Sequence, residues 1–252
     1  MPPGQPETQP ESQPARNNRD WMGDGDSFTS HGAILTRPSE PPAMNPNLLM
    51  PAVTLKAGDA LLVIDVQRDF MPGGALGIQE GELIIPPLNR VITAFLRQRL
   101  PVLYSRDWHP ADHCSFQAQG GPWPPHCVQN SPGAAFDARL DLAPKPLIFS
   151  KGQHRAEDQY SAFLAEDEGG QPLSATLRRQ GLRRLFVAGL ATDYCVSNTA
   201  LDLRRAGYGV IVLTDACRAV NLDPDDERQA LRRMAGAGAT LVATTDLGVC
   251  RT

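Results

Sequence analysis

The chain has 252 residues, of which 41% are hydrophobic and 21% are charged, and its formal net charge at pH 7 is -4. This size and composition allow one well-formed core, and we predict a single globular domain. The negative net charge gives no indication of the basic face that nucleic-acid binding normally needs, so we expect no nucleic-acid partner.

Residues 1–52 are rich in Pro, Gln, Asn, Ser and Gly and show neither helical nor strand periodicity. They predict a disordered extension, followed by a folded domain over residues 53–252. The N-terminus lacks the basic region and hydrophobic stretch of a signal peptide, and no apolar run approaches the ~20 residues needed to cross a bilayer. We therefore expect a cytoplasmic protein without a membrane partner.

From residue 60 onward, short apolar runs alternate with amphipathic stretches. Residues 88–99 have apolar side chains at helical spacing, and helical segments accompany most of the apolar runs. Continuous Val, Ile and Leu runs separated by helices favour a parallel sheet covered on both faces. The sequence thus predicts a three-layer α/β/α domain with a mainly parallel, roughly six-stranded sheet. The predicted strands are residues 60–66, 101–107, 146–151, 184–190, 208–215 and 239–244.

Polar residues follow several of these strands, where ligands bind in open parallel sheets. A capping carboxylate, a solvated lysine or an inert cysteine would explain each one singly. Asp65, Lys151 and Cys195 together supply a base, a cation that lowers the pKa of a thiol, and the thiol itself, which favours a cysteine nucleophile. The full set is Asp65, Asp107, His109, Lys151, residues 192–195 and Asp215.

Cys195 follows the strand at 184–190 almost directly, and the sequence 192–205 predicts a helix that begins at once. We expect the side chain of Thr192 or Asp193 to cap this helix. Cys195 then lies in the first turn, where free backbone N–H groups and the helix dipole favour the thiolate. The same N–H groups can bind an oxyanion.

None of the other cysteines has such a setting, and the chain contains no CxxC pair. An odd number of cysteines is a poor basis for a disulfide framework, so we expect reduced thiols. The five are Cys114, Cys127, Cys195, Cys217 and Cys250.

A second group of residues has the types found in metal sites. Asp107 and His109 stand at i and i+2 on an extended segment and therefore project to the same side. His126 can complete a facial site for Zn, Fe or Mn, and His113 is a fourth candidate. Ordinary hydrogen-bonding histidines are the alternative, because an Asp-x-His pattern alone is a weak metal signal.

Five segments carry a resemblance to a known family. They are VIDVQRDFMPGGAL, SRDWHPADHCSF, WPPHCVQNSPGAAF, KG with DQYSAF shortly after it, and VAGLATDYCVSNTALDLRRAGYGVIVLTDACRAV. In this order and with these flanks they resemble the nicotinamidases of the isochorismatase-like hydrolase superfamily. The resemblance extends from about residue 60 to the end of the chain.

The resemblance implies that Asp65, Lys151 and Cys195 form a catalytic triad. It also implies an oxyanion hole made by the backbone N–H groups of Ala191 and Cys195, next to a Leu190–Ala191 peptide bond that is cis in the family. The implied reaction is hydrolysis of nicotinamide to nicotinate and ammonia through a cysteine thioester, as part of NAD salvage. Pyrazinamide is expected to be a further substrate.

The resemblance further implies one divalent metal ion (Zn, Fe or Mn) held by Asp107, His109 and His126. His113 matches a position that binds the metal in some members and not in others. Three aromatic side chains fall where the family surrounds the pyridine ring: Phe70, Trp123 and Tyr160. The family contains monomers and larger assemblies, so a homo-oligomer is one of the two expectations for the quaternary state.

Three other functions stay open at this point. A related amidohydrolase of the same superfamily would use the same triad on an N-carbamoyl or ureido compound. A non-catalytic module would keep the metal for structure, and a redox sensor would use the reactive thiol but would need a resolving cysteine. The implied metal ligands, together with Phe70 and Trp123, favour a pyridine substrate over these alternatives.

Overall fold

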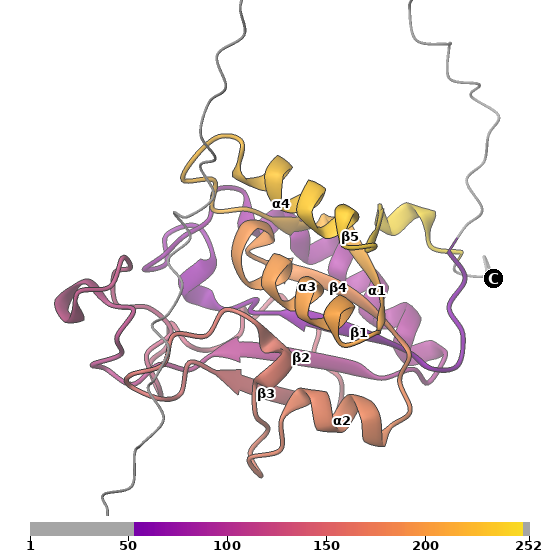
Figure 1. The fold of residues 1–252 in the computed structure, drawn as a ribbon, viewed down its shortest axis with the longest axis horizontal. Coiled ribbons are helices and arrows are strands. Elements are labelled where there is room, and N and C mark those ends of the chain that lie inside the picture. Colours follow the sequence, from indigo (N-terminus) through magenta and orange to yellow (C-terminus); the bar gives the residue numbers. More distant parts are fainter. Residues whose placement is uncertain (1–52, 249–252) are drawn as a thin grey trace, which may run out of the picture. The chain divides into compact units, whose positions relative to one another are not determined.

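The computed structural model describes residues 53–248, and the predicted disordered extension lies outside them. Within this part of the chain, six parallel strands form one sheet in the order β3-β2-β1-β4-β5-β6 (Figure 1). The strands are β1 (Asp59–Ile64), β2 (Val102–Asp107), β3 (Leu147–Lys151), β4 (Arg184–Leu190), β5 (Gly209–Arg218) and β6 (Thr240–Val242). The predicted parallel α/β fold is confirmed.

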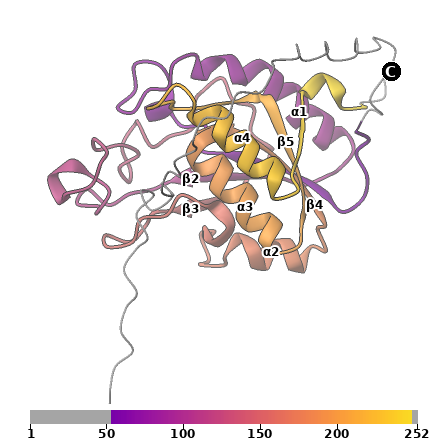
Figure 2. The same cartoon turned by 45° about the horizontal axis from the view of Figure 1, so that its top comes forward.

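Four α-helices of the described residues cover the two faces of the sheet. They are α1 (Ile85–Arg97), α2 (Leu173–Arg179), α3 (Ser197–Arg205) and α4 (Asp226–Gly236). The chain moves from β1 to β2 in one direction and from β4 to β5 in the other, so right-handed crossovers place α1 on one face and α3 on the opposite one. Figure 2 shows α2, α3 and α4 together in front, with α1 behind them. None of the described helices is long and apolar enough to cross a membrane.

Apolar side chains on both faces of β1 place this strand at the centre of the core. All six of its residues are buried. Helix α1 covers one face with Leu88, Ile92 and Phe95, which recur at i, i+4 and i+7 and are fully buried. The Phe95 ring meets the ring of Phe186 on β4 edge to face, with centroids 5.2 Å apart.

Several element boundaries differ from the predicted ones, and two of the differences have a clear local cause or consequence. Helix α1 begins at Ile85 rather than at residue 88, because Pro86 and Pro87 fall in its first turn, where a missing N–H costs nothing. Strand β5 continues to Arg218, and its pairing with β4 shifts register between Val187 and Gly189. This irregularity lies beside the end of β4, where the candidate site begins.

The strand order reverses between β1 and β4, because the chain leaves β1 toward one edge of the sheet and β4 toward the other. Open α/β sheets bind ligands at this switch point, outside the carboxyl ends of the strands. Asp65 directly follows β1, Asp107 and Lys151 end β2 and β3, and Cys195 follows β4. The fold therefore brings the predicted residues to one edge of the sheet.

Candidate active site

The ammonium group of Lys151 contacts both other residues of the predicted triad. This side chain ends β3 and is fully buried. Its Nζ lies 3.0 Å from Oδ2 of Asp65 and donates to Sγ of Cys195 across 3.3 Å. The same ammonium donates to Oδ1 of Asp107 and weakly, across 3.4 Å, to the carbonyl oxygen of Gln159. A base, a cation and a thiol thus meet in one buried cluster.

Asp65 is held in place from the neighbouring strand. It has a left-handed backbone with φ of 49°, and its N–H donates to the carbonyl oxygen of Ser105 across 3.2 Å. The buried Ser105 hydroxyl donates to Oδ1 of Asp65 at 2.7 Å, while Oδ2 faces Lys151. Ser105 therefore fixes which carboxylate oxygen is directed toward the thiol chemistry.

Burial controls the proton affinities of this cluster. It raises the pKa of the Asp65 carboxyl above its ordinary value, although the charge of Lys151 acts in the opposite direction. Burial also raises the pKa of the Cys195 thiol well above its ordinary value, and the lowering effect of Lys151 does not offset it. Lys151 therefore lowers the pKa of the Cys195 thiol, as predicted, but burial raises it by more. The raised pKa of Asp65 makes this group a better proton acceptor than an ordinary carboxylate.

Cys195 lies in a π-helical turn, Thr192–Val196, that leads directly into α3. Such turns are rare and occur frequently at functional sites. Cys195 is in the first helical turn after β4, as predicted, but the predicted cap is wrong. Ala191 is the N-cap residue, and no side chain caps the turn. Asp193 instead accepts the N–H groups of Val220 and Asn221, and the Thr192 hydroxyl donates to Glu227 across 3.3 Å.

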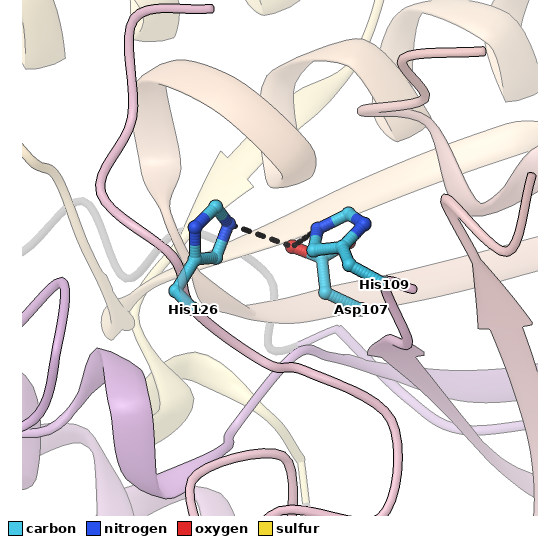
Figure 3. A group of neighbouring side chains, drawn as sticks. All are labelled: Asp107, His109 and His126. Carbon is cyan, nitrogen blue, oxygen red and sulfur yellow. Dashed lines mark ion pairs between the residues drawn. The ribbon is translucent and has the colours of Figure 1, made fainter. Parts of the chain in front are cut away.

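Asp107, His109 and His126 form the group predicted to bind a metal (Figure 3). All three are buried, and one ligand atom from each lies within 4.8 Å of the others. Nε2 of His109 is 3.7 Å and Nε2 of His126 is 4.0 Å from Oδ2 of Asp107. One carboxylate and two imidazoles facing a common point can hold a divalent ion with positions left open.

The backbone fixes the orientation of both imidazole rings. Nδ1 of His109 lies 2.9 Å from the carbonyl oxygen of Gly152, and Nδ1 of His126 lies 2.8 Å from that of Pro124. A carbonyl oxygen can only accept, so each Nδ1 donates and each Nε2 presents a lone pair. Burial lowers the pKa of His126 and so favours the neutral ring that binds metals. Second partners of this kind are typical of metal-binding histidines.

His113 lies outside this group. Its ring is close to the ring of His109, with centroids 4.2 Å apart. Nδ1 of His113 is 2.7 Å from the Ser115 hydroxyl, and Nε2 is 3.0 Å from the carbonyl oxygen of Glu157. Both nitrogens thus have protein partners in this conformation, and a ligand role for His113 stays a prediction.

A small pocket opens beside the thiol and the metal-binding group. One wall is aromatic: Nε1 of Trp123 donates to the Tyr160 hydroxyl across 3.0 Å, and the Tyr194 ring lies 5.2 Å from Trp123 and 5.5 Å from Tyr160. The pocket reaches all three predicted aromatic positions. Its lining residues are Phe70, Leu76, Asp107, Trp123, His126, Tyr160, Ala191, Tyr194, Cys195 and Val220.

Two further predicted positions have different outcomes. The Leu190–Ala191 peptide bond is cis, as the resemblance implied, and Ala191 and Cys195 both line the pocket. Asp215, the remaining polar residue near a strand end, does not line the pocket. Its carboxylate accepts the N–H and the hydroxyl of Thr244, both at 2.7 Å, and so has a structural function in the turn after β6.

Comparison with known proteins identifies the family. Residues 59–246 match the model of the isochorismatase domain. The chain belongs to the isochorismatase family. The nicotinamidase of Escherichia coli (strain K12) is 42% identical over 205 residues, which cover 74% of this chain and 95% of that protein.

Two solved structures show the same fold. A pyrazinamidase of Pyrococcus horikoshii in complex with zinc is 44% identical, with a TM-score of 0.68 over 74% of this chain and 99% of that one. A protein from L. infantum in complex with nicotinate is 37% identical, with a TM-score of 0.71 over 78% of this chain and 98% of that one. The predicted kinship with nicotinamidases is confirmed.

In this member of the isochorismatase family, the sequence did not reveal four residues of the site. Ser105 is a small polar residue inside a mostly buried strand, where a hydroxyl has no distinguishing pattern. Leu76 and Val220 are apolar and have no chemical signature. Tyr194 precedes the nucleophile directly, so an aromatic residue next to Cys195 at the start of a helix was the one available signal.

Proposed function

We propose that the chain is a nicotinamidase, which hydrolyses nicotinamide to nicotinate and ammonia in NAD salvage in the cytoplasm. The observation that carries this proposal is the Cys195 thiol, 3.3 Å from a buried ammonium that also contacts Asp65, in the wall of an aromatic pocket. Two comparisons support this substrate: the Escherichia coli relative is a nicotinamidase, and the L. infantum protein binds nicotinate. Pyrazinamide has a ring of the same size and is a second substrate.

Asp65 removes the proton from Cys195 as the thiolate attacks the carboxamide carbon. Burial raises the pKa of Asp65, which makes this carboxylate a better proton acceptor. The new C–S bond converts the carbonyl oxygen into an oxyanion, for which the N–H groups of Ala191 and Cys195 are the proposed donors. Lys151 stabilises the negative charge on sulfur and carboxylate throughout, because its ammonium contacts both.

The second half of the cycle releases both products. Asp65 returns its proton to the amide nitrogen, the C–N bond breaks, and ammonia leaves a thioester on Cys195. Asp65 is then a carboxylate again and takes a proton from water, which attacks the thioester carbon. The C–S bond breaks and the proton returns to the sulfur. The product is nicotinic acid, which ionises to nicotinate and gives its proton to the released ammonia. Atoms and charges balance without a further reactant.

Asp107, His109 and His126 fit a resident divalent ion, because both imidazole lone pairs and one carboxylate oxygen face a common point. Zinc is our choice among Zn, Fe and Mn, since these ligand types suit it and the Pyrococcus horikoshii relative contains it. An ion held by these residues would supply Lewis acidity, which would orient the pyridine ring and withdraw electrons from it. Phe70, Trp123 and Tyr160 enclose the ring itself.

Replacement of the nucleophile tests the proposed chemistry. Cys195→Ala removes the attacking sulfur, so ammonia release from nicotinamide is expected to fall by on the order of 10⁴-fold or more. The matched control is Cys114→Ala, since Cys114 is half-buried and does not line the pocket. Ammonia release is measured with both variants at equal folded concentration, checked by circular dichroism. Wild-type activity in Cys195→Ala would show that the sulfur is not the nucleophile.

Metal removal tests the proposed ion. Dialysis against a chelator is expected to lower the melting temperature, and zinc present at 100 times its Kd restores about 2.7 kcal/mol of unfolding free energy. His126→Ala is expected to abolish this zinc-dependent shift in Tm. His154→Ala is the matched control, because His154 is exposed and lies outside the group. Equal zinc-dependent shifts in both variants would contradict the assigned ligands.

The alternative substrate class needs a separate measurement. An N-carbamoyl or ureido compound would release ammonia through the same triad, and no residue of the triad distinguishes it from nicotinamide. Parallel assays of nicotinamide, pyrazinamide and an N-carbamoyl amino acid compare kcat/KM directly. The aromatic wall at Trp123, Tyr160 and Tyr194 predicts a preference for the two ring substrates. A higher kcat/KM for the carbamoyl compound would replace the proposed function with the alternative.

A further inference from the structure

The carboxylate of Asp193 joins two segments of the chain that are separated in sequence. Asp193 is two residues before Cys195 in the π-helical turn and is only 8% exposed. Its Oδ1 accepts the N–H of Val220 at 3.0 Å, and its Oδ2 accepts the N–H of Asn221 at 2.9 Å. Hydrogen bonds to an ionised acceptor are about twice as strong as neutral ones, so this pair firmly connects the two segments.

The segment held in this way connects β5 to α4 and contributes to the pocket. Val220 lines the pocket next to Cys195 and Ala191. Asn221 has a left-handed backbone, with φ of 52°, and its Oδ1 accepts the N–H of Glu227 at 3.0 Å. Val220 lines the pocket whereas Asn221 does not, and Asp193 holds both residues through their N–H groups.

A second contact joins the same two segments. The hydroxyl of Thr192, next to Asp193, donates to Oε1 of Glu227 across 3.3 Å. The π-helical turn thus contacts the β5–α4 connection at the pocket wall and at the start of α4. Because Asp193 and Cys195 share one turn, the position of Val220 is defined relative to the nucleophile.

We propose that Asp193 is a positioning residue that fixes Val220 as an apolar wall of the pocket and so limits the size of the ring accepted beside Cys195. This inference rests on the proposed nicotinamidase activity. Asp193 contacts neither the thiol nor the residues of the metal-binding group, and acts through Val220. A wall held by two charge-assisted bonds cannot retreat to admit an added methyl group, because both N–H groups would lose their acceptor. Nicotinamide that carries one ring methyl is therefore discriminated against at this wall.

The test compares kcat/KM for nicotinamide with that for nicotinamides methylated at each unsubstituted ring carbon in turn. Val220→Ala removes two methyl groups from the wall, and we expect it to raise the relative kcat/KM for at least one methylated substrate by about tenfold. Asp193→Asn replaces one of the two acceptor oxygens with a donor, and we expect it to raise the same ratio for the same substrate. It should raise KM for nicotinamide and change kcat by less than about threefold, since the triad is untouched.

The double variant distinguishes an effect through Val220 from a general loosening. If Asp193 acts through Val220, Asp193→Asn adds little to the ratio once residue 220 is alanine, whereas independent effects would multiply. Asp202→Asn is the matched control, because the Asp202 carboxylate forms a salt bridge with Arg205 on the outer side of α3. We expect wild-type ratios from it. Multiplying effects, or an unchanged ratio in Asp193→Asn, would overturn the proposal.

Two further outcomes are also decisive. Asp193→Ser keeps one acceptor in a smaller side chain and replaces Asp193→Asn if that variant does not fold. Failure of both to fold would assign Asp193 to folding and overturn the positioning role. A folded wild-type protein that releases no ammonia from nicotinamide would overturn the proposed function and this inference together, whereas an active wild type with unaltered ratios in the variants overturns this inference alone.

Discussion

Lys151 lies where the thiol and the metal-binding group meet. A buried ammonium is costly unless it is paired, and here it contacts the carboxylates of Asp65 and Asp107. Burial alone would lower the pKa of Lys151, but these two carboxylates raise it well above its ordinary value. A lysine that keeps its proton can stabilise a thiolate but cannot accept the proton of Cys195. Asp65 is therefore the group of the triad that accepts it.

Ser105 gives a prediction at the scale of a single hydrogen bond. Its hydroxyl donates to Oδ1 of the buried Asp65 carboxylate at 2.7 Å. Hydrogen bonds to charged groups contribute about 1.5–3 kcal/mol, so Ser105→Ala is expected to lower kcat for nicotinamide roughly 10- to 100-fold. Ser105→Thr keeps the hydroxyl and should retain more activity. Steady-state kinetics on both variants, together with melting temperatures, separate orientation of Asp65 from loss of stability. A wild-type kcat in Ser105→Ala would mean that Lys151 alone orients Asp65.

Site residues at strand ends could be predicted from the sequence, whereas those placed by tertiary contacts could not. Asp65, Lys151 and Cys195 could be predicted because each lies at or just beyond a strand end, where a polar residue stands out against an apolar run. Val220 could not be predicted, since its place in the pocket depends on the hydrogen bond that its N–H donates to Asp193, 27 residues away. The pKa of Cys195 could not be predicted either, because full burial outweighs the effect of Lys151.

At the scale of elements, the close approach of β4 to β1 sets the distance between the nucleophile and its base. β1 leads to Asp65 and β4 leads to Cys195, and Gly189 pairs with Ile64 between them. Gly189 has φ of 125°, and a Cβ atom there would overlap the backbone of Ile64. Any larger residue would push apart the two strands that position Asp65 and Cys195.

Gly189→Ala is therefore expected to be severely destabilising. Overpacking and a left-handed backbone together should lower the free energy of unfolding by at least about 3 kcal/mol. Gly236→Ala is the matched control, since Gly236 ends α4 and a Cβ there meets nothing within 4 Å. It should raise stability by about 0.5–1 kcal/mol, because alanine favours the helix. Urea unfolding of both variants measures the difference, and a Gly189→Ala protein as stable as wild type would contradict the close approach.

Strand and helix identities could be predicted from the sequence more completely than their ends. The run 184–190 coincides with β4, because its apolar residues are bounded by arginines and by the site. The predicted strand 239–244 is shorter in the structure, as β6 ends at Val242 and the chain then turns at Thr244. That turn is held by Asp215 on β5, a tertiary contact that local sequence patterns do not encode.

At the scale of the whole molecule, the central core contains thiols that titrate only at high pH. Cys127, Cys195 and Cys217 are buried, and burial raises the pKa of each above the ordinary value of 9.0. For Cys217 the pKa rises to about 12. In the unfolded chain the same thiols are solvated and release their protons near the ordinary value. The folded state therefore binds more protons than the unfolded state at alkaline pH.

This difference predicts alkaline destabilisation with a defined sign. The folded pKa of Cys217 lies above the unfolded one, so its contribution to stability is complete below pH 9 and is lost as pH rises toward 12. The loss is about 1.4 kcal/mol per pH unit for one thiol.

Urea unfolding of the wild type, Cys217→Ala and Val212→Ala at pH 8 to 11 measures this loss. Cys217→Ala should reduce the slope of unfolding free energy against pH by about that amount. Val212→Ala, which shortens an equally buried side chain without a titrating group, should keep the wild-type slope. Equal slopes in Cys217→Ala and the wild type would show that Cys217 does not contribute to the pH dependence.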